Sequence, residues 1–324
     1  MIVVTGGAGF IGSALIHKLN QIGRKDIIVV DELGTDDKWK NLNNLQFIDY
    51  MEKDFFLEFI ADDYEGKSKF EAVFHMGANS STTEKDMSYL IENNFEYTKD
   101  VAHYCARNKV RFIYASSAAT YGDGSQGYKD DHEGIVNLRP LNKYGFSKQL
   151  FDNYALKTGL INEIVGLKFF NVFGPNEYHK GNMRSMVLKS FEQIRDTGKV
   201  KLFKSYKKDF GDGEQKRDFV YVKDVVDMMV FFLENDKTGI YNVGTGEARS
   251  WNDLATAVFD AMGKPVKIQY IDMPESIRHQ YQYFTQAEMS KIREVGYSAP
   301  FTALEEAVKD YVQNYLMNNT LYLG

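Results

Sequence analysis

The sequence of 324 residues predicts an α/β fold, in which a doubly wound parallel sheet is followed by a smaller C-terminal lobe. Up to about residue 170, short runs rich in β-branched residues alternate with amphipathic stretches of helical periodicity. Such alternation is typical of βαβ units, whose parallel strands are covered by helices on both faces. After about residue 171 this order loosens, and glycines, aromatic residues and charged loops mix with helices.

Each element follows from its local pattern. Strands are predicted at Ile2–Thr5, Ile27–Val30, Gln46–Ile48, Ala72–His75, Phe112–Ala115 and Glu163–Phe169, where β-branched and aromatic residues gather. Helices are predicted at Ile11–Leu19, Tyr89–Cys105, Ser185–Arg195 and Trp251–Met262, where apolar residues recur every three to four positions.

No linker rich in Pro, Gly or Ser and no internal repeat divides the chain. We therefore expect a main domain over residues 1–170 and a lobe over 171–324 that packs against it. Segments near 219–222 and 240–243 are expected to return to the main sheet. The chain has the length to form both parts around a large core.

Composition excludes several classes of protein. The formal net charge is −6, and acids interrupt short basic clusters such as Lys207–Lys208, so a nucleic-acid binder is not expected. The single cysteine, Cys105, excludes an intrachain disulfide and suits a reducing compartment. The first residues enter a strand directly, and the longest apolar runs are too short to span a membrane, which predicts a cytoplasmic protein. The histidines have no spacing typical of metal ligands, so no metal is expected.

A glycine-rich loop follows the first predicted strand. Gly6, Gly9 and Gly12 have the spacing G-x-x-G-x-x-G and open a predicted helix. Residues without a Cβ let the backbone approach a pyrophosphate, and the amides of the helix N-terminus bind its charge. Asp31 ends the next strand, as in Rossmann-type dinucleotide-binding domains. The sequence therefore predicts a nicotinamide dinucleotide on a Rossmann-type sheet.

The choice between NAD and NADP is open at this level. Asp31 can accept a hydrogen bond from a ribose hydroxyl, which favours NAD. Lys38 and Lys53 follow it, and either could neutralise the 2′-phosphate of NADP.

Tyr144 and Lys148 form a Y-x-x-x-K pattern. On a helix this spacing places the phenol and the ammonium on one face. A lysine charge favours the phenolate of a tyrosine whose ordinary pKa is about 10, so Tyr144 can serve as an acid and base. Upstream, Ser117 follows a predicted strand and is the first choice for binding the reacting oxygen, with Thr120 next.

These motifs, together with Phe170–Pro175 and Arg217–Val225, resemble the extended short-chain dehydrogenases/reductases. Narrower segments are similar to those of the ADP-L-glycero-D-manno-heptose 6-epimerases, and the resemblance covers nearly the whole chain. Those segments are Asp49–Lys53, His75–Glu84, His179–Gly181 and Tyr281–Gln286.

The resemblance implies NADP as a tightly bound cofactor, one per subunit, with ADP-D-glycero-β-D-manno-heptose as substrate. It also implies a homo-oligomer, a pentamer, and a role in supplying heptose for the lipopolysaccharide core. Besides the loop glycines, it implies cofactor contacts for Phe10, Ile11, Asp31, Glu32, Lys38, Lys53, Met76, Gly77, Ala78, Asn79, Ser80, Asn93, Lys148 and Val172. Substrate contacts are implied for Asn171, Lys180, Asn182, Lys189, Phe203, Lys204, Ser205, Tyr206, Arg217 and Tyr281.

Three features depart from the pattern of those epimerases. Position 189 is Lys where His is expected, and position 182 is Asn where Ser is usual. The stretch from Lys204 to Lys216 is longer, which leaves the contacts at 203–206 open.

The implied reaction inverts a secondary alcohol at carbon 6 of the heptose. No carbonyl is adjacent, so its C–H is not acidic, and transient oxidation to a ketone with return of hydride to the opposite face is expected. Tyr144 and Lys180 would act as acid and base for the two orientations, which requires a lowered pKa for Lys180. Lys148 would hold the nicotinamide ribose, and Arg217 would bind the diphosphate.

Two alternatives remain. Another sugar-nucleotide epimerase or dehydratase shares the broad motifs, although Ala118–Tyr121 lacks the acidic pair expected of a dehydratase. A non-catalytic NADP-binding regulatory protein could reuse the fold, but such proteins commonly lose the Tyr or the Lys.

Overall fold

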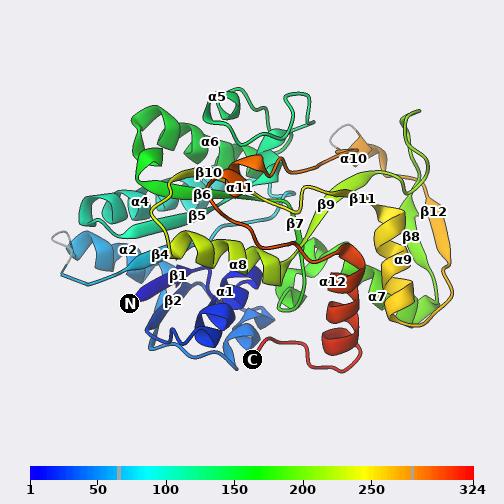
Figure 1. Ribbon diagram of the computed structural model, residues 1–324, viewed down its shortest axis with the longest axis horizontal. Coiled ribbons are helices and arrows are strands. Elements are labelled where there is room, and N and C mark those ends of the chain that lie inside the picture. Colours follow the sequence, from blue (N-terminus) through cyan, green and yellow to red (C-terminus); the bar gives the residue numbers. More distant parts are fainter. Residues whose placement is uncertain (64–66, 279–280) are drawn as a thin grey trace.

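A computed structural model describes residues 1–63, 67–278 and 281–324 (Figure 1). Its main sheet has seven strands, all paired in parallel, in the order β10-β6-β5-β4-β1-β2-β3. The chain thus builds outward from β1 to β3, returns to β4 beside β1, and builds outward on the other side. This confirms the predicted doubly wound α/β fold and creates a switch point between β1 and β4, where such sheets bind ligands. The strands are β1 (Ile2–Thr5), β2 (Ile27–Asp31), β3 (Asp49–Glu52), β4 (Ala72–His75), β5 (Arg111–Ser117), β6 (Ile164–Phe169) and β10 (Gly239–Val243).

Helices cover this sheet, and strands β1, β2, β4, β6 and β10 are buried throughout. Among the covering helices, α1 packs on α8 and α2 packs on α4 (Figure 1). Burial on both faces explains why the strands read as continuous apolar runs in the sequence. The covering helices are α1 (Phe10–Gln21), α2 (Lys53–Asp62), α4 (Tyr97–Asn108), α6 (Lys143–Thr158) and α8 (Val222–Leu233).

The third strand lies later in the chain than predicted. Gln46–Ile48 precedes the strand, Ile48 is 60% exposed, and pairing with β2 begins at Asp49 opposite Ile28. The prediction was wrong because β3 is an edge strand of mixed exposure, so its apolar residues do not mark its position.

A turn of π-helix interrupts the predicted helix Tyr89–Cys105. The order is α3 (Met87–Ile91), the π segment Glu92–Glu96, then α4. Such turns insert an extra residue and occur often at functional sites. This one places Asn93 on the wall of the groove described below, and the buried Asn94 against the backbone of Asn79.

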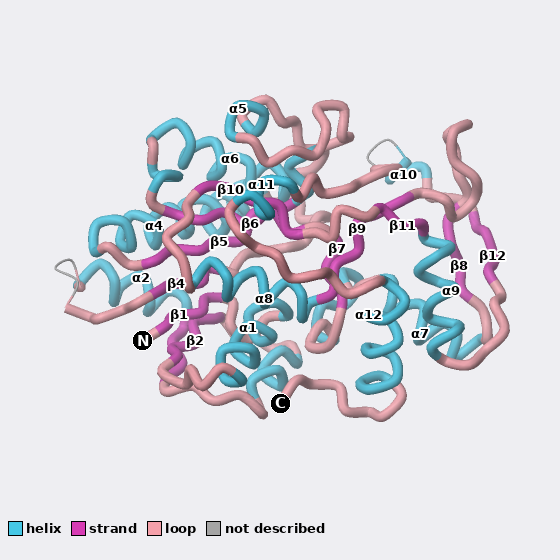
Figure 2. Tube along the Cα trace, in the orientation of Figure 1, coloured by secondary structure: helices cyan, strands magenta, loops and turns pink. Residues whose placement is uncertain are grey.

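The C-terminal lobe contains two small sheets and lies to the right in Figures 1 and 2. One sheet has the order β11-β9-β7 and the other pairs β12 with β8. Helix α9 packs against both α7 and α12, and all three helices pack against these strands. The bounds are β7 (Asn171–Phe173), α7 (Met186–Thr197), β8 (Val200–Phe203), β9 (Lys216–Tyr221), β11 (Ala248–Ser250), α9 (Trp251–Ala261), β12 (Ile268–Ile271) and α12 (Leu304–Asp310).

One of the two returning segments was placed in the wrong sheet. Ile240–Val243 lies in β10 of the main sheet, as expected. Phe219–Tyr221 instead lies in β9, which pairs with β7 and β11. The reason is topological: β7 follows β6 directly and leaves the main sheet, and β9 adds to it before α8 leads the chain back. The division at residue 170 stays a prediction.

Short segments complete the chain. They are α5 (His132–Ile135), α10 (Glu275–Arg278), α11 (Ser290–Glu294), the 3₁₀ segments Asp37–Leu42, Ala118–Tyr121, Leu160–Asn162 and Tyr178–Met183, and the π segment Tyr311–Leu316. Within the described ranges, no helix has both the length and the apolarity that a membrane crossing requires.

Candidate active site

A cavity of about 670 Å³ opens where the carboxyl ends of the main strands face the C-terminal lobe. The loops after β1, β2, β4, β5 and β6 form one side, and Lys180, residues 183–187 and Trp251 form the other. A second cavity of about 280 Å³ shares Gly6, Asp31 and Gly77 with the first. The two therefore form one groove, long enough to take an extended ligand across the switch point of the sheet.

The glycine loop forms the floor of this groove. Gly6 has a φ of +64°, and a Cβ there would lie 2.6 Å from the amide nitrogen of Gly77. A Cβ on Gly12 would lie 2.1 Å from the carbonyl oxygen of Gly6. Helix α1 begins after Gly9 without a side-chain cap and without an acidic residue in its first turn. These free amides and the helix dipole fit a pyrophosphate.

Two lysines, Lys38 and Lys53, line the end of the groove that the smaller cavity forms. The ammonium of Lys38 lies 2.8 Å from Oδ1 of Asp31, whose other oxygen accepts from the amide of Ala8 at 2.9 Å. The ammonium of Lys53 lies 2.9 Å from the Glu32 carboxylate and 2.7 Å from Oδ1 of Asn93. Acids that can bind ribose hydroxyls therefore lie beside cations that can bind a phosphate.

Asn94, which the sequence reasoning missed, supports the loop after β4. Its Oδ1 accepts from the amide of Asn79 at 2.9 Å, and its Nδ2 donates to the carbonyl of the same residue at 2.9 Å. The Nδ2 also donates to Ser147 Oγ on α6 at 3.0 Å. Asn94 thus fixes the loop 76–80 relative to the helix of Tyr144. Only its place beside the predicted Asn93 could have suggested it.

Tyr144 and Lys148 lie one turn apart on α6, as predicted, and both line the cavity. The helix starts after Asn142, whose side chain accepts from the amide of Gly145 at 2.7 Å. A Cβ on Gly145 would lie 2.8 Å from the carbonyl of Ala119, so this glycine lets α6 approach the turn after β5. The close approach brings Tyr144 to Ser117.

The pKa values of the Tyr144 and Lys148 side chains are both shifted from their ordinary values. Burial raises the pKa of Tyr144, and a hydrogen bond with the Ser117 hydroxyl opposes that shift. Burial lowers the pKa of Lys148 to about 8, which the carboxylate of Asp152 opposes. A ligand that hydrogen-bonds to the ammonium would favour its charged form.

Of the two hydroxyls considered at the end of β5 and in the turn after it, that of Ser117 lines the cavity and that of Thr120 does not. Thr120 Oγ1 donates to the carbonyl of Ser117 at 2.7 Å and accepts from Lys168 at 2.7 Å. Ser117 Oγ accepts from the amide of Ala119 at 3.1 Å, so its proton can be donated either to Tyr144 or to an oxygen in the cavity.

Lys180 reaches the cavity from the segment Tyr178–Met183 of the lobe. Its ammonium lies 5.3 Å from the ring centre of Phe10, at the start of α1. Burial lowers the pKa of Lys180, and the charge of Glu177 opposes this. Ser185 holds that carboxylate through its amide and through its hydroxyl at 2.7 Å. The lysine is therefore desolvated, as a lysine base requires.

The predicted substrate residues divide into two groups. Asn171 and Lys180 line the cavity. Arg217 lies one layer behind, where its guanidinium is 5.6 Å from the ring centre of Trp251, itself a lining residue, and 5.2 Å from that of Tyr281. The Phe203 ring packs on Tyr281 at 6.2 Å.

The other predicted substrate residues lie off the cavity wall. Lys189 donates to the carbonyl of Asn182 at 2.6 Å. Lys204 and Tyr206 both contact the carboxylate of Asp272. The amide of Ser205 donates to Asp212 at 2.8 Å, inside the long stretch before β9.

By contrast, every predicted cofactor residue lines one of the two cavities. The sequence reasoning missed several residues that line the larger cavity, from both the main domain and the lobe. Among them are Asp36, Ser81, Phe170, His179, Met183, Arg184, Ser185, Met186, Phe219 and Trp251. Ser81, Phe170, His179 and Phe219 stood in motifs that carried the resemblance, whereas the others did not. Trp251 reaches the site from a helix remote in sequence, which no local pattern reveals.

The comparisons with known proteins agree with this geometry. Residues 2–244 match the NAD dependent epimerase/dehydratase family. The chain belongs to this family. Within it, the chain is 53% identical to the ADP-L-glycero-D-manno-heptose-6-epimerase of Fusobacterium nucleatum, over 100% of each chain.

Solved structures of the family share the fold of this epimerase/dehydratase chain. The Helicobacter pylori ADP-L-glycero-D-manno-heptose-6-epimerase superposes with a TM-score of 0.80 and 31% identity, covering 97% of this chain and 95% of the other. The UDP-glucose 4-epimerase of Thermus thermophilus in complex with NAD gives 0.76 and 26%, covering 97% and 98%. A nicotinamide dinucleotide is thus the cofactor class of the family. Among the described residues, no group of three or more His, Cys, Asp or Glu side chains could hold a metal ion.

Proposed function

We propose that this chain converts ADP-D-glycero-β-D-manno-heptose into ADP-L-glycero-β-D-manno-heptose by inverting carbon 6. The observation that carries the proposal is the 53% identity over the full chain to an enzyme of that name. The cavity supports it, because Ser117, Tyr144 and Lys180 converge there with a groove that fits a dinucleotide.

Inversion at an alcohol carbon without an adjacent carbonyl requires temporary loss of its hydrogen as hydride. The chemistry that a bound nicotinamide supplies is reversible hydride acceptance from that carbon. The chain itself must then bind the resulting planar ketone, let it turn, and manage the hydroxyl proton on either side.

Tyr144 serves one orientation of the hydroxyl. Its phenolate takes the hydroxyl proton as oxidation proceeds and returns a proton when the alcohol re-forms. Burial opposes the phenolate, so the Ser117 hydroxyl and the ammonium of Lys148, one turn along α6, must stabilise it. Ser117 also hydrogen-bonds to the reacting oxygen.

Lys180 serves the other orientation. It reaches the cavity from the C-terminal lobe, whereas Tyr144 belongs to the main domain, so the two groups stand on different walls. Because burial lowers its pKa, Lys180 can lose its proton nearer neutrality than a solvated lysine. A Lys180→Ala enzyme that keeps full turnover would defeat this two-base scheme.

NADP is the proposed cofactor. Lys38 and Lys53 lie at the groove end that an adenosine ribose would occupy, and two ammonium groups there favour a 2′-phosphate. Arg217, held between Trp251 and Tyr281, is proposed to bind the diphosphate of the substrate. The substrate contacts predicted for Asn182, Lys189 and residues 203–206, which do not line the cavity, stay predictions.

The alternatives are weaker. A dehydratase would need an acid beside the sugar, whereas the acids that line the large cavity, Asp31 and Asp36, belong to the groove end of Lys38. A UDP-hexose 4-epimerase shares the fold, but the Thermus relative is only 26% identical. A non-catalytic regulator is not favoured, because both Tyr144 and Lys148 face the cavity.

The test is to incubate the purified protein with ADP-D-glycero-β-D-manno-heptose and separate the two carbon-6 epimers over time. Approach to equilibrium from either epimer, without added cofactor, is the expected result. If no product forms even with NADP⁺ supplied, the heptose assignment fails and UDP-hexoses are the next substrates. The pentamer stays a prediction that sedimentation analysis can check.

A further inference from the structure

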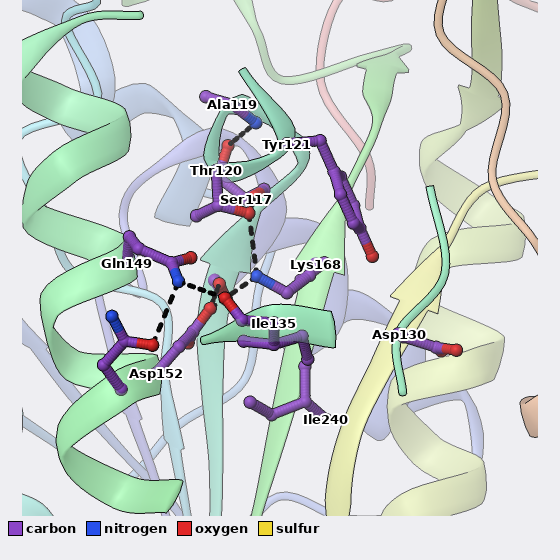
Figure 3. Close-up of polar contacts among 12 residues, drawn as sticks. Ser117, Ala119, Thr120, Tyr121, Asp130, Ile135, Gln149, Asp152, Lys168 and Ile240 are labelled. Carbon is purple, nitrogen blue, oxygen red and sulfur yellow. Dashed lines mark hydrogen bonds and ion pairs between the residues drawn. The ribbon is translucent and has the colours of Figure 1, made fainter. Parts of the chain in front are cut away.

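A buried ion pair lies close to the turn that follows Ser117 (Figure 3). The ammonium of Lys168, on β6, lies 2.5 Å from Oδ2 of Asp152, on α6, and both side chains are 0% exposed. Neither group touches the cavity, so neither can act on a substrate directly.

The ammonium of Lys168 also contacts the turn that follows β5. Lys168 also donates to Thr120 Oγ1 at 2.7 Å, and Thr120 Oγ1 donates to the carbonyl of Ser117 at 2.7 Å. Figure 3 shows the ammonium between this turn and the Asp152 carboxylate. One charged group therefore links the backbone of Ser117 to α6.

On the α6 side, Asp152 lies one turn after Lys148 and two turns after Tyr144. Its carboxylate accepts from Tyr114 at 2.8 Å and from Ser116 Oγ at 2.7 Å, both on β5. Gly166 makes room for this contact, because a Cβ there would lie 2.5 Å from the Tyr114 hydroxyl. The helix of Tyr144 and the strand of Ser117 are thus joined at one carboxylate.

We propose that Lys168 and Asp152 are positioning residues, which hold the Ser117 hydroxyl opposite the Tyr144 phenol for proton transfer. The proposal rests on the proposed epimerase function, and it adds two residues that act through others. It distinguishes the pair from Lys148, which faces the cavity itself.

Stability alone does not account for such a pair. Removing two charges from water is costly, and a buried ion pair can often be replaced by apolar side chains of similar volume without loss of stability. Removing a single partner is far more damaging, because a bare charge is then buried. A double apolar replacement is therefore the variant that separates positioning from folding.

The experiment compares Asp152→Leu/Lys168→Met with the wild type. We expect a folded protein that retains bound NADP and has KM within about twofold, whereas kcat falls about a hundredfold because the proton-transfer geometry is lost. The matched control is Asp310→Leu/Lys223→Met, which removes the 2.7 Å ion pair between α12 and α8, away from the cavity, and should keep kcat. Full kcat in the Asp152/Lys168 variant overturns the proposal.

Thr120 provides a second test if the double variant does not fold. Thr120→Val breaks the link to the Ser117 carbonyl but leaves the ion pair, and we expect kcat to fall about tenfold at unchanged KM. Thr120→Ser keeps the hydroxyl and should restore kcat. Equal kcat in both Thr120 variants and the wild type overturns the proposal.

A readout without substrate separates this proposal from the function. Amide hydrogen exchange of the turn at residues 118–122 should quicken in both the double variant and Thr120→Val, with an unchanged unfolding midpoint. If wild-type protein does not epimerise ADP-heptose, the proposed function fails, and the exchange data still decide whether the pair holds the turn. Unchanged exchange in these variants contradicts the positioning role.

Discussion

The ammonium of Lys38 lies 2.8 Å from a carboxylate oxygen of Asp31, at the end of the second strand. Asp31 is the residue that would bind a ribose hydroxyl of NAD, and Lys38 is one that would bind the 2′-phosphate of NADP. The pairing means that a phosphate must compete with Asp31 for the lysine.

Lys38→Met should therefore weaken NADP binding by about 10- to 100-fold, the value of one charge-assisted hydrogen bond of about 1.5–3 kcal/mol. NAD affinity should change little, because Asp31 becomes free for the ribose. Titration of cofactor-free protein with both dinucleotides measures this. Lys40→Met is the control, since Lys40 pairs with Asp37 and does not line the groove. Equal losses of affinity for NADP and NAD would show that Lys38 does not bind the 2′-phosphate.

Tyr144→Phe should lower kcat by about 10²- to 10⁴-fold, the usual contribution of a general acid and base. The ring keeps its packing, so the variant should copurify with cofactor as the wild type does. Tyr154→Phe is the matched control on the same helix, because that hydroxyl contacts His103 rather than the cavity. Steady-state epimerisation and the cofactor content of the purified proteins are the measurements. Unchanged turnover in Tyr144→Phe would contradict the proposed mechanism as a whole.

The charge of Glu177 should influence the pH at which kcat falls on the acid side of its pH profile, here called the acid limb. For the epimer whose hydroxyl faces Lys180, this residue acts as a base only as the neutral amine, so turnover from that epimer rises as pH passes the pKa of Lys180. Burial lowers that pKa and Glu177 opposes the shift. Glu177→Gln removes the opposing charge, so the acid limb of kcat should move to lower pH. Exposed Glu163 provides the control, Glu163→Gln, with an unmoved limb. A limb that moves upward, or not at all, would exclude Lys180 as the titrating base.

His75 should make stability depend on pH. It is fully buried between Thr5 and Thr98, and burial lowers its pKa to about 3 from 6.5. Between those values the unfolded chain binds a proton that the folded chain does not, so stability falls as pH falls. The slope is about 1.4 kcal/mol per pH unit for one proton.

Urea unfolding of wild type and His75→Gln from pH 6.5 down to pH 4.5 measures this difference. The free energy of unfolding of the wild type should fall more steeply than that of the variant, by about the slope of one proton. Parallel curves for the two proteins would mean that His75 is protonated in the folded state.

Local features were readable because their geometry is local. The G-x-x-G-x-x-G loop and the Tyr144–Lys148 pair depend only on neighbouring backbone, and both are found where predicted. The parallel sheet followed from alternation of strands and helices. Edge strand β3 was misplaced by a few residues, because the exposed Ile48 just before it mimics a buried strand position.

The remaining features depended on contacts between segments far apart in the chain. Sequence could offer both Ser117 and Thr120 as partners of the reacting oxygen, and Lys168 decided between them by holding Thr120 away from the cavity. Asn94 joined the site through a turn of π-helix. Phe219–Tyr221 left the main sheet because β7 offered a free edge.

By itself, then, the sequence determined the class of fold, through the alternation of strand and helix patterns. It also determined the dinucleotide loop and the Tyr–Lys pair, because hydrogen bonding within a few residues sets their geometry. Only the tertiary structure decided which side chains meet across the groove, such as Lys180 with Phe10 and Arg217 with Trp251. Their meeting depends on the strand order and on how the lobe packs, and neither is encoded in the spacing of neighbouring residues.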